Sequence, residues 1–256
     1  MVSDFHRDHF AAAETPLAFS LGTHRPAIFR GLVAFEYIRA IAANMHGTGK
    51  LMMANATPDR LCWLTPMLDV LGTETDCNPR GKWRPMDDAH LLYRRALCKG
   101  KPFYFLMNSA FEDFPHDLVA RYMKRALANG CFPGFFRHNA SEGHYFTRPE
   151  LYERDRPLFR KYVPLCKLVA EAGWEPITGA RSGDEHIHIE RFGDQGTRYL
   201  TIFNDSPERR DTTITLSMKT SETSRELVRG KSVSWTSGKT SVSLDGEDVA
   251  VLELLP

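Results

Sequence analysis

The sequence lacks an excess of charge of either sign, a long apolar run and a recognisable secretory signal. Lysine and arginine number 33 against 32 for aspartate and glutamate, and this formal net charge of +1 disfavours generic capture of nucleic acid or of an anionic membrane. No apolar run approaches the roughly 20 residues that a membrane helix needs, and residues 1–10 are polar and charged. We therefore expect no nucleic-acid partner, no membrane partner and, by default, a cytoplasmic location.

Cysteine pairs are also absent, because the five cysteines are widely spaced and none stands in a Cys-x-x-Cys motif. Such a set disfavours a structural zinc site and is typical of small buried thiols. The rest of the composition, 42% hydrophobic and 25% charged over 256 residues, is that of a soluble globular protein. The length indicates two domains or one large one.

Residues 1–178 alternate short apolar runs with segments of helical periodicity. Strands are predicted at residues 16–20, 50–55, 68–74, 102–108 and 131–136, and helices at 31–46, 87–99, 115–129 and 149–172. This alternation predicts a mostly parallel sheet with helices packed outside it. The strands are apolar on both faces, as buried parallel strands are. A closed (β/α)8 barrel has eight strands, and this part of the chain holds roughly half of them.

The composition changes near residue 180, after which threonine and serine dominate and apolar residues alternate with polar ones. Seven short strands are predicted, separated by turn sequences such as Gly193-Asp194 and Asp245-Gly246. Short strands with regular turns are typical of an antiparallel β-sandwich. We therefore expect an α/β domain over residues 1–178 and a sandwich domain over residues 185–256.

A parallel barrel followed directly by a small sandwich resembles retaining glycoside hydrolases of the alpha-galactosidase (melibiase) kind. Several stretches resemble barrel strands, the join and the first sandwich strands of those enzymes. They are LMMANA at 51–56, LDVLGTE at 68–74, ANGCFPGFF at 128–136, GWEPI at 173–177, IERF at 189–192 and YLTIFN at 199–204. The resemblance implies a partial (β/α)8 barrel, roughly its last four strand–helix units, followed by the sandwich.

The resemblance also implies a departure from the complete enzymes, in which a nucleophilic aspartate commonly ends the fourth barrel strand. By this comparison the chain begins just after that strand. Asp4 and Asp8 are the early carboxylates near the right place, and neither follows a recognisable strand. The resemblance therefore implies a truncated hydrolase. The chain alone is expected to be inactive, and a chain with a completed barrel is expected to be active.

Hydrolysis of a glycosidic bond requires two carboxylic groups that flank it, and a barrel presents its reactive groups at the carboxyl ends of its strands. Glu74 stands at such an end and is the predicted general acid or base, with Asp76 two residues further on as a second candidate. The alternative for both is a solvated loop carboxylate. An acid at this position needs partial burial or a neighbouring negative charge to hold its proton.

Four further residues are predicted to contact the sugar. Asn55 and Asn108 fall at strand ends, where an amide pairs with hydroxyl groups as both donor and acceptor. His138 and His144 follow the last barrel strand, next to aromatic residues that suit the apolar face of a sugar. The alternatives are loop capping for the amides and simple cover of the barrel mouth for the histidines.

Metal and cofactor chemistry are not expected. The run HIHIE at residues 186–190 places two histidines and a glutamate on one face of a strand, which favours an exposed polar face over a metal site. Three functional hypotheses remain: a glycoside hydrolase without cofactor, a non-catalytic carbohydrate-binding or scaffold protein, and a metal-dependent enzyme using this run. A half barrel exposes sheet edges and an apolar face, so self-association or pairing with a complementary half is expected.

Overall fold

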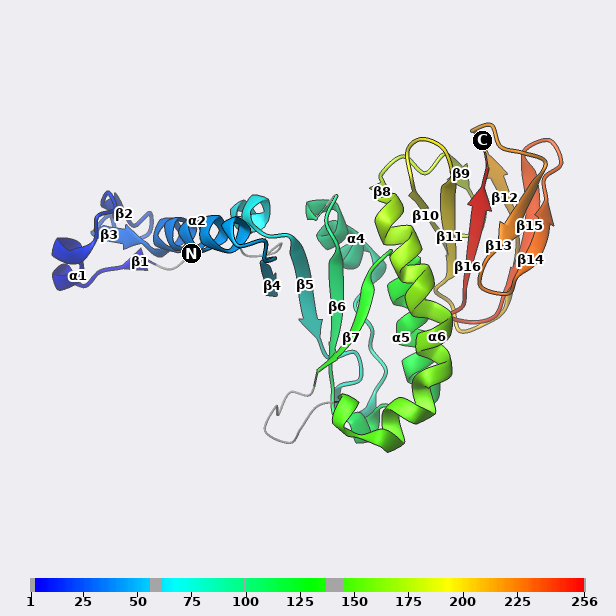
Figure 1. The fold of residues 1–256 in the computed structure, drawn as a ribbon, viewed down its shortest axis with the longest axis horizontal. Helices are drawn as coiled ribbons and strands as arrows, with labels where there is room; N and C mark the ends of the chain where they lie inside the picture. Colours follow the sequence, from blue (N-terminus) through cyan, green and yellow to red (C-terminus); the bar gives the residue numbers. More distant parts are fainter. Residues whose placement is uncertain (1–2, 56–60, 99, 137–144, 256) are drawn as a thin grey trace. The chain divides into compact units, whose positions relative to one another are not determined.

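The computed structural model describes residues 3–55, 61–98, 100–136 and 145–255, and Figure 1 shows the fold. The chain divides into two compact units, Met1–Leu71 and Gly72–Pro256. The domain boundary predicted between residues 178 and 185 falls inside the second unit and stays a prediction. Within the described part of the chain, every helix is too short or too polar to cross a membrane.

The first unit contains an antiparallel sheet rather than a parallel one. Strand β3 (Pro26–Phe29) pairs antiparallel with β1 (Ser3–Asp4) on one side and with β2 (Ala18–Phe19) on the other. The predicted parallel arrangement is therefore wrong for the strand at residues 16–20. The reason is the short connection of residues 20–25, because a parallel pair needs a crossover of a dozen residues or more. The unit also contains α1 (Arg7–Ala12), α2 (Arg30–Gly47), β4 (Met53–Asn55) and the 3₁₀ helix η1 (Cys62–Met67).

The helix predicted at residues 31–46 is present as α2, but its apolar stripe is only partly covered. Ala42 is the buried residue of α2, and the rest of the stripe is half-buried. Large apolar side chains of this unit are exposed: Leu17, Phe19, Leu21, Tyr37, Leu51 and Met53. Exposed apolar side chains that gather on one surface mark interfaces between proteins.

The second unit begins with a sheet in which three strands lie in the order β5, β6, β7. These are β5 (Val70–Thr75), β6 (Phe103–Asn108) and β7 (Phe132–Phe136), and β6 and β7 are parallel. Between and after them come α4 (Asp88–Leu97), α5 (His116–Ala128) and α6 (Pro149–Ala172), with 3₁₀ turns η2 (Pro79–Gly81), η3 (Phe111–Asp113) and η5 (Tyr145–Thr147). The protein is therefore a mixed α/β structure that contains a parallel strand pair.

Helix α5 forms where its apolar residues recur at helical spacing, and it buries that stripe against β7. Tyr122 in this stripe is fully buried, and burial raises the pKa of its phenol well above the ordinary value. Its hydroxyl donates to the carbonyl of Gly134 at 2.8 Å and accepts the Gly134 N–H at 2.9 Å. The same hydroxyl also bonds the carbonyl of Phe105. One buried phenol thus ties α5 to both parallel strands.

Two antiparallel sheets form the rest of the second unit. One has the order β14-β13-β16-β11-β10-β8 and the other the order β15-β12-β9. Their strands are β8 (Trp174–Glu175), β9 (Ala180–Arg181), β10 (Ile187–Phe192), β11 (Arg198–Asn204), β12 (Arg210–Leu216), β13 (Thr223–Glu226), β14 (Lys231–Ser234), β15 (Lys239–Leu244) and β16 (Val249–Leu254). One apolar core contains Leu252 and Ile202 from the first sheet and Ile214 and Leu244 from the second.

Helices α5 and α6 pack on the larger antiparallel sheet, as Figure 1 shows, with α5 against β11 and β16 and α6 against β10 and β11. The backbone at Gly130 lies against the ring of Phe192 at this junction. A Cβ atom added at Gly130 would lie 2.2 Å from that ring, so a larger residue does not fit there. The hydroxyl of Thr201 donates to the carbonyl of Ala128 at 2.6 Å across the same junction. Apolar packing and buried hydrogen bonds therefore hold the α/β layer and the antiparallel sheets in one compact unit.

Candidate functional site

Glu74 and Asn108 meet at one edge of the parallel sheet. Glu74 is the second-last residue of β5 and Asn108 is the last residue of β6. The Asn108 Nδ2 donates to the Glu74 Oε1 at 3.0 Å. The bond places the carboxyl ends of the two strands side by side, where parallel sheets collect reactive groups. The structure thus brings together two of the residues that the sequence singled out, while their chemical roles stay predictions.

The environment of this pair differs from the one expected for a proton donor. The Glu74 side chain is exposed rather than partly buried. The Asn108 Oδ1 is buried and accepts no hydrogen bond from the residues that the structure describes. A buried amide acceptor beside a carboxylate suits the hydroxyl of a ligand, because satisfying that acceptor recovers the cost of its burial.

Asp76 takes part in the turn that follows β5. Its Oδ1 accepts the N–H of Asn78 at 2.9 Å, an Asx turn of the kind that aspartate forms locally. Cys77 between them is buried, and burial raises the pKa of its thiol to about 11. The thiol is therefore protonated at neutral pH and is no nucleophile. The predicted catalytic role of Asp76 stays a prediction, and its observed contact is a structural one.

Of the other three predicted sugar contacts, one lies in the first unit and two lie outside the described residues. Asn55 ends β4 in the first unit and is exposed, and its role stays a prediction. His138 and His144 lie outside the described residues. Beside the pair, the Ser109 N–H donates to the carbonyl of Phe136 at 3.2 Å. This bond continues the β6–β7 ladder past the end of β6 and holds the edge that carries Asn108.

Asp4 corrects one expectation from the sequence, because it does end a strand, the two-residue β1. Its buried carboxylate accepts from the backbone N–H of His6 at 3.0 Å and contacts the Nδ1 atoms of His6 and His9 at 2.8 Å each. These hydrogen bonds, with the backbone bond the strongest, hold the pKa of Asp4 well below its usual range. The carboxylate therefore stays ionised, and it lines an apolar cavity of about 590 Å³ with Ile28 and Tyr37.

Two groups of side chains in the described part of the chain could hold a metal ion. One is Asp4, His6 and His9, and the other is Asp88, His188 and Asp205. The second group corrects the expectation that residues 186–190 form an exposed face, because His188 and Glu190 are half-buried under α4. The members of this group stand 17 to 117 positions apart, so no local spacing in the sequence indicates it. The alternating HIHIE run is the one sequence signal that points to any of its members.

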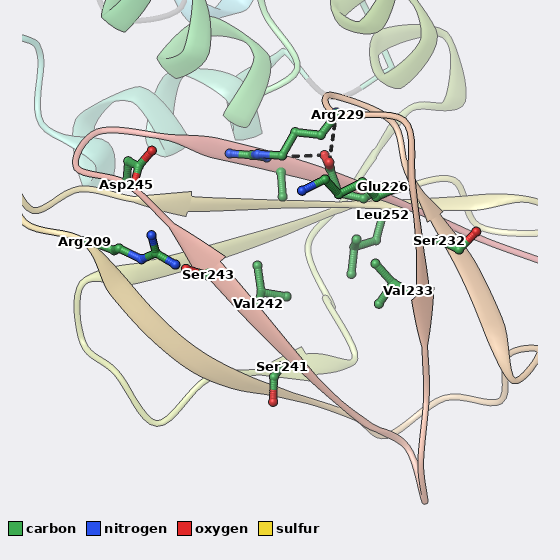
Figure 2. Close-up of a pocket in the computed structure, with 12 residues that line it drawn as sticks. Arg209, Glu226, Arg229, Ser232, Val233, Ser241, Val242, Ser243, Asp245 and Leu252 are labelled. Atoms are coloured by element: carbon green, nitrogen blue, oxygen red, sulfur yellow. Dashed lines mark hydrogen bonds and ion pairs between the residues drawn. The ribbon is translucent and has the colours of Figure 1, made fainter.

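Another hollow, of about 340 Å³, lies on the antiparallel sheets and is shown in Figure 2. Val233, Val242 and Leu252 line it. Glu226 at its rim accepts the N–H groups of Val228 and Arg229, both at 2.9 Å. These bonds give the main polar group of the hollow a structural role in the turn after β13, so we do not place the functional site there.

No known protein family matches the sequence, and no curated protein does. Solved structures do resemble the fold. Alpha-galactosidase I from Mortierella vinacea matches with a TM-score of 0.52 at 9% identity, over 88% of this chain and 63% of that one. A noncanonic maltogenic alpha-amylase, AmyB, from Thermotoga neapolitana matches with a TM-score of 0.52 at 10% identity, over 87% of this chain and 59% of that one.

The chain spans about three fifths of the length of these two enzymes. Identities this low concern the arrangement of helices and strands rather than the chemistry of particular side chains. The likeness covers both the α/β layer and the antiparallel sheets, because it extends over more than four fifths of this chain. The chain therefore has a glycoside hydrolase-like fold.

Proposed function

We propose that the chain acts on O-glycosidic bonds of a carbohydrate by two-carboxylate chemistry, without a cofactor. In this proposal the β5–α4, β6–α5 and β7–α6 units belong to a (β/α)8 barrel, and the antiparallel sheets form a carboxy-terminal β-sandwich over residues 185–256. The observation that carries the proposal is the Glu74–Asn108 pair at the carboxyl ends of adjacent strands. The likeness of the fold to glycoside hydrolases supports it.

In this proposal Glu74 donates a proton to the leaving oxygen, and Asn108 orients the carboxyl group of Glu74. The Asn108 amide holds one carboxyl oxygen of Glu74 in place at 3.0 Å and turns its own oxygen toward a sugar hydroxyl. Asp76 remains a second candidate for the acid. Asn55, His138 and His144 complete the proposed contacts to the sugar.

A second function, binding a carbohydrate without hydrolysing it, is favoured by the exposure of Glu74. A general acid requires partial burial or a neighbouring negative charge to hold its proton, and Glu74 is exposed. In this alternative Asn108 and its neighbours bind the sugar, and the chain serves as a carbohydrate-binding or scaffold protein.

Hydrolysis of activated aryl glycosides by the purified chain separates the two functions. The chain is incubated with a panel of α- and β-linked nitrophenyl glycosides, and binding of the matching free sugars is measured by calorimetry. We expect release of nitrophenol from at least one glycoside when a partner half completes the barrel, whereas the isolated chain is expected to be inactive. Saturable sugar binding without release supports the binding protein instead. If neither release nor binding occurs, both proposals are wrong.

We also propose that the chain self-associates or pairs with a complementary barrel half. The exposed apolar side chains of the first unit and the edge position of β7 in the described sheet both favour a partner. Light scattering at several concentrations is expected to give a mass above the 29.1 kDa of one chain. A monodisperse species of monomer mass at every concentration would contradict this expectation.

A further inference from the structure

A compact group of acidic and imidazole side chains lies where α4 meets the larger antiparallel sheet. Asp88 is the first residue of α4, His188 stands within β10 and Asp205 directly follows β11. The Nε2 atom of His188 lies 2.8 Å from the Oδ2 of Asp205 and 3.7 Å from the Oδ2 of Asp88. One imidazole nitrogen therefore faces two carboxylates that come from separate elements.

Several carboxyl groups and one arginine lie around this point. The Asp88 side chain is only 12% exposed. Glu190, two residues after His188 on β10, accepts from the indole N–H of Trp174 at 2.6 Å. The cation paired with Asp88 is Arg125, whose Nη2 lies 2.9 Å from the other carboxyl oxygen, Oδ1. Burying carboxylates together is costly unless a further positive charge offsets them.

The geometry is close to that of a first-row metal site. Zinc bonds to imidazole nitrogen and to carboxylate oxygen are about 2.0–2.2 Å long, so ligand atoms at two corners of a tetrahedron stand about 3.3 Å apart. The two measured separations from the His188 Nε2, 2.8 and 3.7 Å, bracket that value. All three ligand atoms lie within 4.8 Å of one another.

A small cavity adds an independent indication. It has a volume of about 10 Å³ and is lined by the polar residues Asp88, Asn129, His188 and Glu190 and by the apolar Leu92, Ala128 and Phe203. A space of that size is close to what one water molecule or one small ion occupies. Two of the three proposed ligands, Asp88 and His188, line it, and Asp205 contacts His188 from outside it.

We propose that Asp88, His188 and Asp205 bind one Zn²⁺ ion that links the start of α4 to strands β10 and β11. Zinc is favoured over Mg²⁺ and Ca²⁺ because one ligand is an imidazole nitrogen, which those two ions rarely take. The site shares no residue with the Glu74–Asn108 pair, so it does not depend on the proposed hydrolase function.

His186 acts in this site as a positioning residue. Its Nδ1 atom lies 2.9 Å from the Oδ1 of Asp205, the carboxyl oxygen that does not face His188. Hydrogen bonds of this kind orient a carboxylate so that its second oxygen is presented to the metal. The His186 bond thus directs the Oδ2 of Asp205 toward the His188 nitrogen.

Zinc titration of the full chain tests the proposal. The chain carries the substitutions His6→Gln and His9→Gln, which remove the second group of metal-binding side chains around Asp4. After treatment with a chelator, calorimetry with Zn²⁺ is expected to show one bound equivalent. At a zinc concentration 100 times the Kd, the midpoint of thermal unfolding is expected to rise by about 5–10 °C.

Single substitutions assign the ligands. His188→Gln or Asp205→Asn, each added to that chain, is expected to weaken Zn²⁺ binding by at least about 100-fold, because even residues one shell further out change metal affinity 10- to 100-fold. The matched control is His46→Gln, which removes another imidazole paired with an aspartate, 2.8 Å from Asp69 in the first unit. It is expected to leave Zn²⁺ affinity unchanged.

Three results would overturn the proposal. The first is that the chain with His6→Gln and His9→Gln binds no zinc. That result is expected if a proton, rather than a metal ion, lies between His188 and its two carboxylates. Alternatively, neither His188→Gln nor Asp205→Asn weakens binding. The third is binding of Mg²⁺ as tight as that of Zn²⁺, which would mean that the imidazole is not a ligand. The first and third measurements use no ligand variant, so they decide the question even if both ligand variants fail to fold.

Discussion

In a chain whose barrel is completed, replacing Glu74 with Gln is expected to lower the rate of aryl glycoside hydrolysis by about 10²–10⁴-fold, the usual effect of losing a general acid or base. Glutamine keeps an oxygen that can accept the hydrogen bond from Asn108, which is 3.0 Å long in the native pair. The substitution therefore removes the transferable proton and preserves the local geometry. Binding of the free sugar, measured by calorimetry, is expected to change little.

A matched control is available on α6. Glu171 is an exposed glutamate whose recorded ion pair is a surface one, 3.6 Å from Lys167, and Glu171→Gln is expected to retain the full rate. If Glu74→Gln turns over at the native rate, Glu74 is not the acid and the catalytic assignment fails. If Glu74→Gln loses sugar binding along with activity, Glu74 holds the sugar rather than transferring a proton.

Asn108 offers a second check on the same assignment. Asn108→Asp places a carboxylate beside Glu74, and a neighbouring negative charge raises the pKa of a carboxyl group. The group stays protonated to higher pH, so the falling limb of the pH–rate profile is expected to move to higher pH. A profile that does not move would contradict the role of Glu74 as the acid.

Local patterns predicted the elements of the second unit well. The helix expected at residues 115–129 is α5, and Val119, Tyr122 and Met123 of its apolar stripe are buried. The seven strands expected after residue 185 are all present. A sheet with one buried face requires apolar and polar residues to alternate along each strand, and this alternation is visible in the sequence. The proximity of Glu74 and Asn108 also followed from one rule, that adjacent parallel strands end at the same edge.

Contacts between distant segments were not predictable in the same way. The strand that ends at Asp4 has two residues, and its partner β3 begins with a proline more than 20 positions later, so neither carries a periodic pattern. The burial of His188 depends on α4 lying over β10, which no spacing within residues 186–190 encodes. Sequence periodicity indicates which face of an element is polar, and tertiary packing decides what covers that face.

Asp155 in α6 is the centre of the largest stability effect that we expect. Its side chain is fully buried and accepts hydrogen bonds from three residues. The donors are the Tyr145 hydroxyl at 2.5 Å, the His116 Nδ1 at 2.7 Å, and the Arg154 Nε and Nη2 at 2.9 and 2.7 Å. Tyr145 belongs in turn to an aromatic group with Phe111 and Phe135 that packs beneath the parallel strands.

Removing this carboxylate is expected to destabilise the protein strongly. Asp155→Ala removes the shared acceptor and leaves Arg154 with the Phe114 carbonyl and Tyr145 with the Leu151 carbonyl. Breaking a buried charged pair costs about 3–5 kcal/mol. Urea unfolding of the native chain and of the variant measures the difference. Asp117→Asn, which changes an exposed carboxylate in the first turn of α5, is the control and is expected to stay within about 0.5 kcal/mol of the native chain.

The same carboxylate is expected to make stability depend on acidic pH. Burial alone would raise the pKa of Asp155, but the hydrogen bonds from Arg154, Tyr145 and His116 outweigh it and hold the pKa below the ordinary value. A carboxyl group with a lowered folded-state pKa adds stability that is fully present above its unfolded value, about 3.9, and is lost as the pH falls through the folded value. The stability difference between the native chain and Asp155→Asn is therefore expected to be constant above about pH 5 and to shrink below about pH 4. A difference that stays the same down to pH 2 would mean that the pKa of Asp155 is the same in the folded and unfolded chains, and the ionised cluster would then be the wrong description of its stabilising role.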